Sequence, residues 1–202
     1  MRILKDNKHK AILYAARNEF IRKGFKDASM RNIARGANVG LSNIYNYFKN
    51  KDEIFVAVVK PAKDDLYSFI KQQHTEKNID FNLISAFGYQ DEMIENYIYL
   101  IDIYKEELRL LLFHSEGSSL RDFREAFIDY ITRVNIDHMN IVKKHYPHAR
   151  YMSDFFIRTL SSWMVASLGE IVTHKLGRHK IREFFKECFQ FEIAGWREII
   201  GV

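Results

Sequence analysis

The chain has 202 residues, which suits a small domain of about 50 residues joined to a larger one of about 150. Hydrophobic residues make up 47% of it and charged residues 28%, the proportions of a soluble globular protein. The single cysteine, Cys188, excludes an internal disulfide framework and a cysteine-cluster metal site, and it suits a reducing cytoplasm, where we expect the protein to act. The N-terminus lacks the apolar core of a signal peptide. Because no run of about 18 or more apolar residues occurs, we expect no membrane span.

Charge is distributed unevenly along the chain. Residues 1–51 contain 12 Lys/Arg against 3 Asp/Glu, a balance of +9, whereas the remainder contains 19 against 23, a balance of −4. A basic head on a mildly acidic body is typical of a polyanion-binding module joined to a second domain. A solvated basic surface without a polyanion partner would show the same charges, so the charge alone does not separate the two interpretations.

Apolar residues recur at helical spacing almost throughout the chain, and only two prolines and nine glycines interrupt it. We therefore predict an all-α protein of about nine helices. The first three are expected at 7–23, at 30–37, and from 41 to 47 or 48. The fourth begins at Asn50, and Pro61 either lies inside it or ends its first part. The others are expected at about 62–75, 80–87, 91–113, 119–145, 149–176 and 179–199.

The first three predicted helices have the spacing of a helix-turn-helix, with the turn at Asn38-Val39-Gly40. Ser29 is a good N-cap for the second helix, and Asn38 tolerates the left-handed backbone that such a turn needs. The third helix is short enough to place its first turn against base edges in the DNA major groove. Glu53, three residues after Asn50, completes a capping box for the fourth helix.

Residues Ile12 to Val58 resemble the N-terminal domain of the TetR family of bacterial transcriptional regulators. The resemblance covers about a quarter of the chain. Three residues depart from the family pattern. Asn38 stands for the usual Gly of the turn, whose left-handed backbone Asn tolerates, and Gly40 stands for a common Ser, so a hydroxyl contact to phosphate is absent. Asn46 stands for a frequent Tyr or Trp, which should change which bases are read. The matching residues are Ile12, Ala15, Ala16, Phe20, Gly24, Phe25, Ser29, Ile33, Ala34, Ala37, Val39 and the run from Ile44 to Asp52.

The resemblance implies a DNA-binding surface on the headpiece. Ser29 and Arg31 are expected to contact phosphate. Tyr45, Tyr47 and Lys51 are expected to contact the DNA backbone. The residues expected to face the groove are Leu41, Ser42, Asn43 and Asn46. Asn43 and Asn46 can each offer the donor–acceptor pair that suits adenine, or can contact phosphate or water instead. Ile44 and Phe48 are interpreted as core residues that hold the third helix down.

The resemblance also implies a homodimer through the last two helices, about 149–176 and 179–199. It further implies a body that releases a near-palindromic operator when a small molecule binds. The broad apolar surface of these two helices favours a partner, although an unusually apolar monomer core would also explain it. We expect an apolar or aromatic effector in a pocket rich in aromatic residues, although each candidate could simply fill the core. The candidates are Phe87, Met93, Tyr97, Tyr104, Phe113, His114, Phe127, His138 and Trp163.

The predicted domains are residues 1–52, which bind DNA, and residues 53–202, which bind the effector and dimerise. An enzyme is disfavoured because the chain has no phosphate loop, His-Glu-x-x-His or nucleophile elbow. No cofactor or metal is expected, since His138, His145 and His148 do not share one helix face. A DNA-binding protein of this type without any small-molecule effector remains an alternative, and the sequence does not separate repressor from activator.

Overall fold

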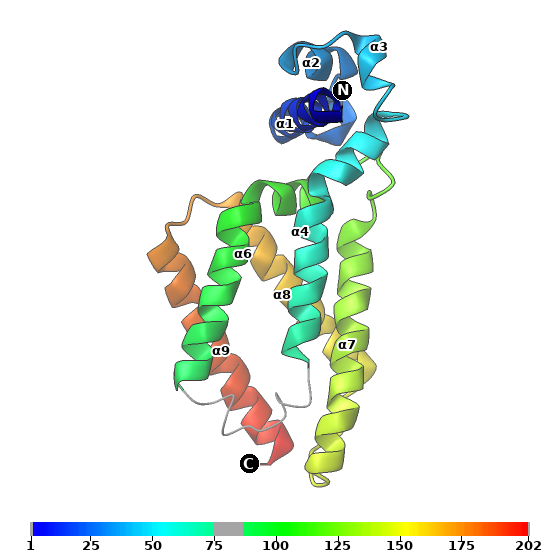
Figure 1. Ribbon diagram of the computed structural model, residues 1–202. Helices are drawn as coiled ribbons and strands as arrows, with labels where there is room; N and C mark the ends of the chain where they lie inside the picture. The colour runs from blue at the N-terminus through cyan, green and yellow to red at the C-terminus, as the bar shows by residue number, and fades with distance from the viewer. Residues whose placement is uncertain (1, 75–86, 202) are drawn as a thin grey trace. The chain divides into compact units, whose positions relative to one another are not determined.

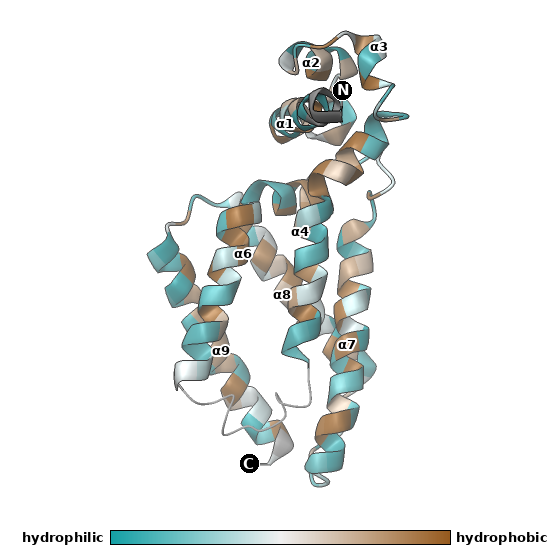
Figure 2. Cartoon of the chain, viewed as in Figure 1, coloured by the Kyte–Doolittle hydropathy of each residue, from teal (hydrophilic) through white to brown (hydrophobic). Residues whose placement is uncertain are grey.

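The structure is a computed structural model that describes residues 2–74 and 87–201 (Figure 1). Those residues contain eight helices and no strand, so the predicted all-α fold is confirmed. The helix expected at 80–87 lies outside the described residues, apart from the backbone of Phe87. Figure 2 shows hydrophobic and hydrophilic residues alternating along the long helices, the pattern of helices that bury one side and expose the other.

The chain divides into two compact units, and each is described by itself. The first contains Met1–Asp64 and Glu106–Arg124, and the second contains Asp65–Lys105 and Glu125–Val202. The first unit is larger than the predicted headpiece of residues 1–52, because a segment far along the chain belongs to it as well.

The first unit is built on α1 (Arg2–Asp27), α2 (Met30–Gly36) and α3 (Leu41–Ile44), with α1 packed on α2 and α2 on α3. The apolar face predicted for the first helix is buried in full. Gly24 adopts a left-handed φ of 71°, a backbone that glycine takes at no steric cost, and thereby ends the regular part of α1 as expected. The buried residues of this face are Ile12, Ala15, Ala16 and Phe20.

Three phenylalanines form the centre of this core. The ring centroids of Phe20 and Phe25 both lie 5.1 Å from that of Phe55, which belongs to α4 (Lys51–Gln73). The Phe25 side chain is buried and belongs to this core. Edge-to-face rings at this separation add to the free energy gained by burial alone.

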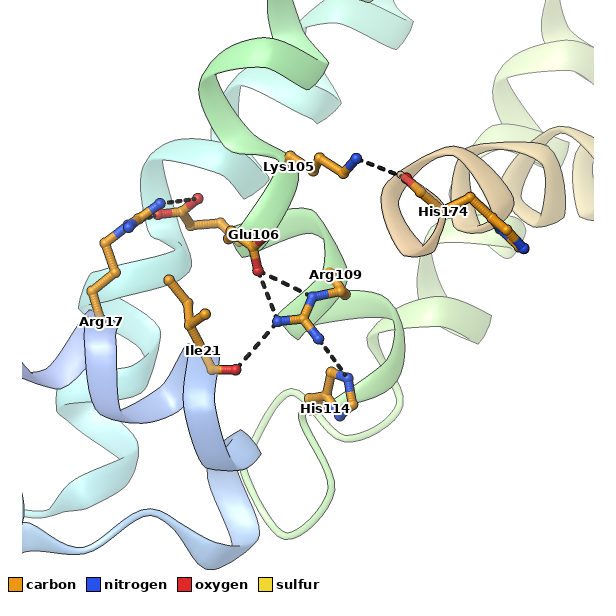
Figure 3. A network of polar contacts seen from close by, with 8 residues as sticks. Arg17, Ile21, Lys105, Glu106, Arg109, His114 and His174 are labelled. Atoms are coloured by element: carbon orange, nitrogen blue, oxygen red, sulfur yellow. Dashed lines mark hydrogen bonds and ion pairs between the residues drawn. The ribbon is translucent and has the colours of Figure 1, made fainter. Parts of the chain in front are cut away.

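Hydrogen bonds explain why Glu106–Arg124 belongs to the first unit. The Phe25 N–H donates to the His114 carbonyl at 2.9 Å. The Arg109 guanidinium donates to the Ile21 carbonyl at 3.2 Å while also holding Glu106 (Figure 3). No apolar periodicity marks such polar contacts between distant segments, so the sequence did not predict them.

The expected helix at 62–75 is not separate, because α4 runs unbroken from Lys51 to Gln73 with Pro61 inside it. Proline removes one N–H bond from a helix interior. Here Val59 and Ala62 are fully buried on either side while Pro61 itself is exposed. Packing on both sides of the proline therefore holds the helix continuous.

The second unit contains most of α6 (Phe87–Phe113) and α7 (Phe123–His145), with α8 (Asp154–Thr173) and α9 (Arg178–Ile200). Isoleucines of α6, α8 and α9 form one buried cluster: Ile94, Ile98, Ile101, Ile171 and Ile181. The Arg178 guanidinium holds Glu95 at 2.7 Å and Asp102 at 2.9 Å, fastening the start of α9 to α6.

The helices α7 and α8 begin later than the expected residues 119 and 149. The Ser153 side chain caps α8 by accepting a hydrogen bond from the Phe156 N–H at 3.2 Å, so the residues before Ser153 lie outside the helix. By length and composition α8 could cross a membrane, and no span was expected here. The core helix of a soluble protein meets the same criterion, and Arg158 within α8 is paired with Glu125 at 3.0 Å and with Asp129.

Candidate functional site

The turn between α2 and α3 has the conformation expected of it. Asn38 has a φ of 51°, the only positive φ of a non-glycine residue in the described ranges 2–74 and 87–201. The regular part of α3 ends at Ile44, earlier than the expected residue 47 or 48. However, the Phe48 N–H still donates to the Ile44 carbonyl at 3.0 Å, so helical bonding continues through the following turn.

Two buried anchors determine which side of α3 faces outward. Ile44 is 0% exposed and Phe48 is 4% exposed, as expected of core residues, and the His9 ring of α1 stacks on Phe48 at 5.0 Å. No pattern in the sequence predicted the His9 contact. Five of the seven residues with predicted groove or backbone contacts are exposed: Leu41, Ser42, Asn43, Tyr45 and Asn46. The other two, Tyr47 and Lys51, are half-buried.

Ser29 begins α2 in a different way from the one predicted. Its backbone is extended as in an N-cap, but its side chain makes no capping hydrogen bond. Its N–H instead donates to the carboxylate of Glu19 at 3.2 Å, and that carboxylate also accepts from the Asn32 side chain at 2.9 Å. Arg31, on the first turn of α2, is exposed, as a phosphate contact requires.

Glu19 is a buried acid that joins α1 to α2, and the Arg22 guanidinium pairs with it. Burial by itself raises the pKa of Glu19, but hydrogen bonds from Arg22, Asn32 and the Ser29 N–H outweigh it and leave the pKa below its ordinary value. The acid is therefore ionised in the folded state at neutral pH. Sequence reasoning counted Glu19 only as a charge and missed this role.

Lys51 has a structural role that sequence reasoning did not predict. Its ammonium donates to the carbonyls of Lys26 and Ala28, each at 3.1 Å, and lies 4.5 Å from the centre of the Phe25 ring. These contacts close the last turn of α1, where carbonyls lack partners within the helix. A contact of Lys51 with a DNA phosphate would use the remaining N–H donor of the ammonium.

The start of α4 is capped nearly as predicted. The Asn50 side-chain oxygen accepts from the Glu53 N–H at 2.8 Å, which is the first half of the capping box. The Glu53 carboxylate accepts from the Lys49 N–H at 2.6 Å rather than from Asn50. The bond that the Glu53 carboxylate accepts in return thus lies one residue before the position expected for a capping box. Tyr47, which lies close to this segment in the sequence, is half-buried.

Two cavities lie in the second unit. The larger, of about 290 Å³, is lined by residues from α4, α6, α7, α8 and α9, and the smaller has about 90 Å³. Ile70, Tyr97, Met164, Phe189 and Glu192 line both. The linings are mostly apolar and aromatic with a few polar groups, which is the composition of a small-molecule site.

Comparison with known proteins identifies the headpiece. Residues 12–58 match the family model described as "Bacterial regulatory proteins, tetR family". The N-terminal part of this chain is therefore similar to the regulators of this family. The matched residues run from the buried Ile12 of α1 to Val58 of α4, and so include the turn at Asn38 and the exposed side of α3.

Two bacterial transcriptional regulators match part of this chain. One is the uncharacterized HTH-type transcriptional regulator YhgD of Bacillus subtilis (strain 168), 43% identical over 61 residues, which are 28% of this chain and 32% of that protein. The other is the HTH-type transcriptional activator FasR of Mycolicibacterium smegmatis, which is 32% identical over 71 residues. Those residues are 35% of this chain and 32% of FasR. The chain thus spans about a third of the length of each.

A solved structure extends the likeness to the whole fold. It is described as a TetR-family transcriptional regulator from Syntrophomonas wolfei, with a TM-score of 0.64 and 15% identity, covering 94% of this chain and 96% of that one. At that identity the match shows a shared fold and nothing about the ligand.

Five of the nine side chains predicted for an effector pocket line the two cavities. Met93 and His138 line the larger cavity, Phe127 and Trp163 the smaller, and Tyr97 both. Three others line neither cavity: Tyr104 donates to Asp65 at 2.7 Å, and Phe113 and His114 lie in the first unit. The side chain of the ninth, Phe87, lies outside the described residues.

Glu192 is the cavity residue that sequence reasoning missed. It follows Cys188 by four residues on α9 and precedes Trp196 by four, so it interrupts an otherwise apolar helix face, and that interruption was the available signal. Burial raises its pKa to about 7 and raises that of the neighbouring Cys188 thiol to about 11. A thiol with a raised pKa is a weak nucleophile, which suits the packing role expected of Cys188.

Proposed function

We propose that this protein is a cytoplasmic transcriptional regulator that binds operator DNA through its helix-turn-helix. The observation that supports it most is the anchoring of α3: Ile44 and Phe48 are buried, while the opposite side, from Leu41 to Asn46, is exposed on a strongly basic headpiece. An exposed polar helix side on a basic surface suits entry into the major groove. In this proposal residues 1–52 form the DNA-binding part and residues 53–202 the sensing part.

In the proposed complex, some contacts position the protein on the DNA and others read the base sequence. Ser29, Arg31, Tyr45, Tyr47 and Lys51 hold the phosphate backbone. A second set faces the bases, with the two Asn amides offering the paired donor and acceptor that adenine presents in the groove. This second set is Leu41, Ser42, Asn43 and Asn46.

The two kinds of contact predict different outcomes on substitution. Arg31→Ala should weaken binding to all sequences alike and reduce the slope of log affinity against log salt by about one, since one phosphate contact is lost. Asn46→Ala should instead relax preference at one base pair, by about 1–3 kcal/mol. Titration of labelled duplexes at several salt concentrations, with single-base variants, checks both. An unchanged binding-site preference for the Asn46 variant would remove its proposed readout role.

Gly40 offers a gain-of-function test. Its φ of −67° and ψ of 147° are accessible to any residue, and a Cβ there would approach no described atom more closely than 3.8 Å. Gly40→Ser is therefore expected to fold normally and to tighten DNA binding about threefold, because a hydroxyl at this position can cap α3 and donate to phosphate. Gly40→Ala, which has no hydroxyl, is the matched control. Equal affinity of the two variants would contradict the hydroxyl contact.

We also propose a homodimer formed through α8 and α9. Phe155 on α8 and Phe191 on α9 are 79% and 70% exposed, and Phe191 packs against the half-exposed Trp163 with ring centroids 6.1 Å apart. Exposed aromatic residues gathered on two neighbouring helices are typical of a protein interface. A single helix-turn-helix covers only one half-site, so two copies would read a near-palindrome.

The regulator is proposed to be a repressor that a small molecule releases from the operator. The cavities of the second unit, mostly apolar and aromatic, support an effector site there. Ligand and operator would be linked through the dimer, because a ligand that favours a different spacing of the headpieces lowers operator affinity. A thermal-shift screen tests the effector: a ligand bound only to the folded protein must raise the melting temperature. If no compound does so, the alternative of a regulator without an effector is favoured.

A further inference from the structure

Glu192 lies where the two cavities of the second unit adjoin. Of the five residues that line both cavities, it alone is acidic, and no other Asp or Glu lines either cavity among the described residues. No hydrogen bond or ion pair to Glu192 is found within the part of the chain that the structure describes. Keeping a half-buried carboxylate ionised without a counter-charge costs free energy. A positively charged ligand that pairs with the carboxylate would therefore gain a favourable interaction that no protein group in the described residues already provides.

The protein itself supplies little positive charge nearby. Neither cavity is lined by lysine or arginine, as far as the described residues extend. His74 and His138 line the larger one, but the His74 ring nitrogens already lie 2.7 Å from the Ile70 carbonyl and 2.7 Å from the Asn135 side-chain oxygen. The histidine is thus engaged with α4 and α7 rather than with Glu192 on α9.

Aromatic rings surround the acid. Tyr97 and Phe189 line both cavities together with Glu192, and the ring of Tyr97 stacks on Phe185 with centroids 4.8 Å apart. Ring faces attract cations through their quadrupole, most strongly where water is excluded. The other aromatic linings are Tyr89, Phe156 and Trp196 in the larger cavity and Phe127, Trp163 and Phe184 in the smaller.

We propose that these cavities bind an amphipathic organic cation, whose positively charged nitrogen pairs with Glu192 and whose apolar part lies against the aromatic walls. The inference rests on the proposed function only in taking these cavities to be the effector site of the regulator. A long-chain carboxylate would place a like charge beside Glu192, and a neutral compound would leave the acid unpaired. The chemistry of the site therefore disfavours both relative to the cation.

Binding of the cation should depend on pH in a defined direction. Because burial raises the pKa of Glu192 to about 7, the acid loses its charge as the pH falls through that value, and affinity for a permanently charged cation must fall with it. His74 and His138 are the histidines that line the larger cavity, and a positive charge on either would also repel a cation. Cys188, Tyr97 and Tyr89, the other titratable groups of the linings, stay neutral there, since burial raises the pKa of all three.

Three probes of equal chain length test the inference: decyltrimethylammonium, decanoate and decanol. The charge of the first two is constant between pH 6 and 8, so a change of affinity reports on the protein. The chain has two tryptophans, and one lines each cavity, Trp196 the larger and Trp163 the smaller. Tryptophan fluorescence and calorimetry of the full chain, without DNA, measure binding.

We expect decyltrimethylammonium to bind at least about tenfold more tightly than decanoate at pH 8 and to lose about tenfold in affinity between pH 8 and pH 6, since most of the carboxylate is protonated over that interval. Glu192→Gln, of nearly equal volume, should lose about tenfold in cation affinity and most of the pH dependence, and should bind decanol as the native protein does. Glu187→Gln on an exposed part of α9 is the matched control and should change nothing.

Tighter binding of decanoate than of the cation, binding of no probe, or a Glu192→Gln variant with native cation affinity and pH dependence would each overturn the inference. These outcomes are independent of the proposed regulation, because no DNA is present. A separate operator-release assay tests that proposal. Selective, Glu192-dependent cation binding that leaves operator affinity unchanged would support the site and contradict its effector role.

Discussion

Replacing Phe155 and Phe191 together by glutamate is expected to produce a monomer and to lower operator affinity at least about 100-fold, because the second headpiece then binds as an independent molecule rather than as a tethered one. The two side chains are the most exposed phenylalanines of α8 and α9. Carboxylates there would have to be desolvated in any interface that these helices form. Analytical ultracentrifugation gives the oligomeric state, and titration of a duplex carrying both half-sites gives the affinity.

A matched control separates dimer loss from general damage. Tyr99 on α6 is 66% exposed in the same unit, so Tyr99→Glu introduces the same charge on a surface outside the proposed interface. This variant should remain dimeric and bind the operator normally. A dimeric Phe155→Glu/Phe191→Glu protein would contradict the assignment of the interface to α8 and α9, as would a monomer that binds the duplex with native affinity.

The second large effect is expected at Glu19. Glu19→Ala removes the acceptor of the Ser29 N–H and the Asn32 side chain and leaves Arg22 without its carboxylate. Losing charged hydrogen bonds at a buried site should lower the free energy of unfolding of the first unit by about 2–3 kcal/mol. Operator affinity should fall as well, since the acid holds α2 against α1. Urea denaturation, with amide exchange at Ser29 as a local probe, measures the change.

The loss should depend on pH in a way that follows from the lowered pKa of Glu19. An acid whose pKa is lower in the folded state stabilises the fold above its ordinary pKa and loses that contribution as the pH falls through the folded value. The difference in the free energy of unfolding between the native protein and Glu19→Ala should therefore be largest at pH 7 and should decrease at acidic pH. Asp27→Ala, at an exposed position of α1, is the control. Equal stability losses for the two variants would contradict the role of Glu19.

The sequence predicted the headpiece well because its signals are local. A left-handed Asn38, buried Ile44 and Phe48, and a cap from Asn50 all follow from short-range rules of turns, helix faces and capping. The contacts of Glu19 and Lys51 were missed because they join residues between 10 and 25 positions apart, and no periodicity encodes a polar bond between elements.

The candidate effector site was predicted only in part, since a cavity is shaped by how helices from distant segments meet. Of the predicted residues, Tyr97 and His138 line the larger cavity. His114 lies in the first unit, where its carbonyl accepts a hydrogen bond from the Phe25 N–H. The apolar pattern of the sequence predicted a pocket rich in aromatic residues. The single acid within that pattern, Glu192, is the residue that distinguishes this cavity chemically.

The central claim, that a dimer reads DNA through α3, is tested most directly by selecting duplexes from a random library with the full-length chain and with an Asn43→Ala/Asn46→Ala variant. The claim predicts enrichment of an inverted repeat whose half-sites are about 34 Å apart or a multiple of it, and altered or lost preference at matching positions in both halves with the variant. No enriched sequence, or the same sequence selected by both proteins, would contradict it.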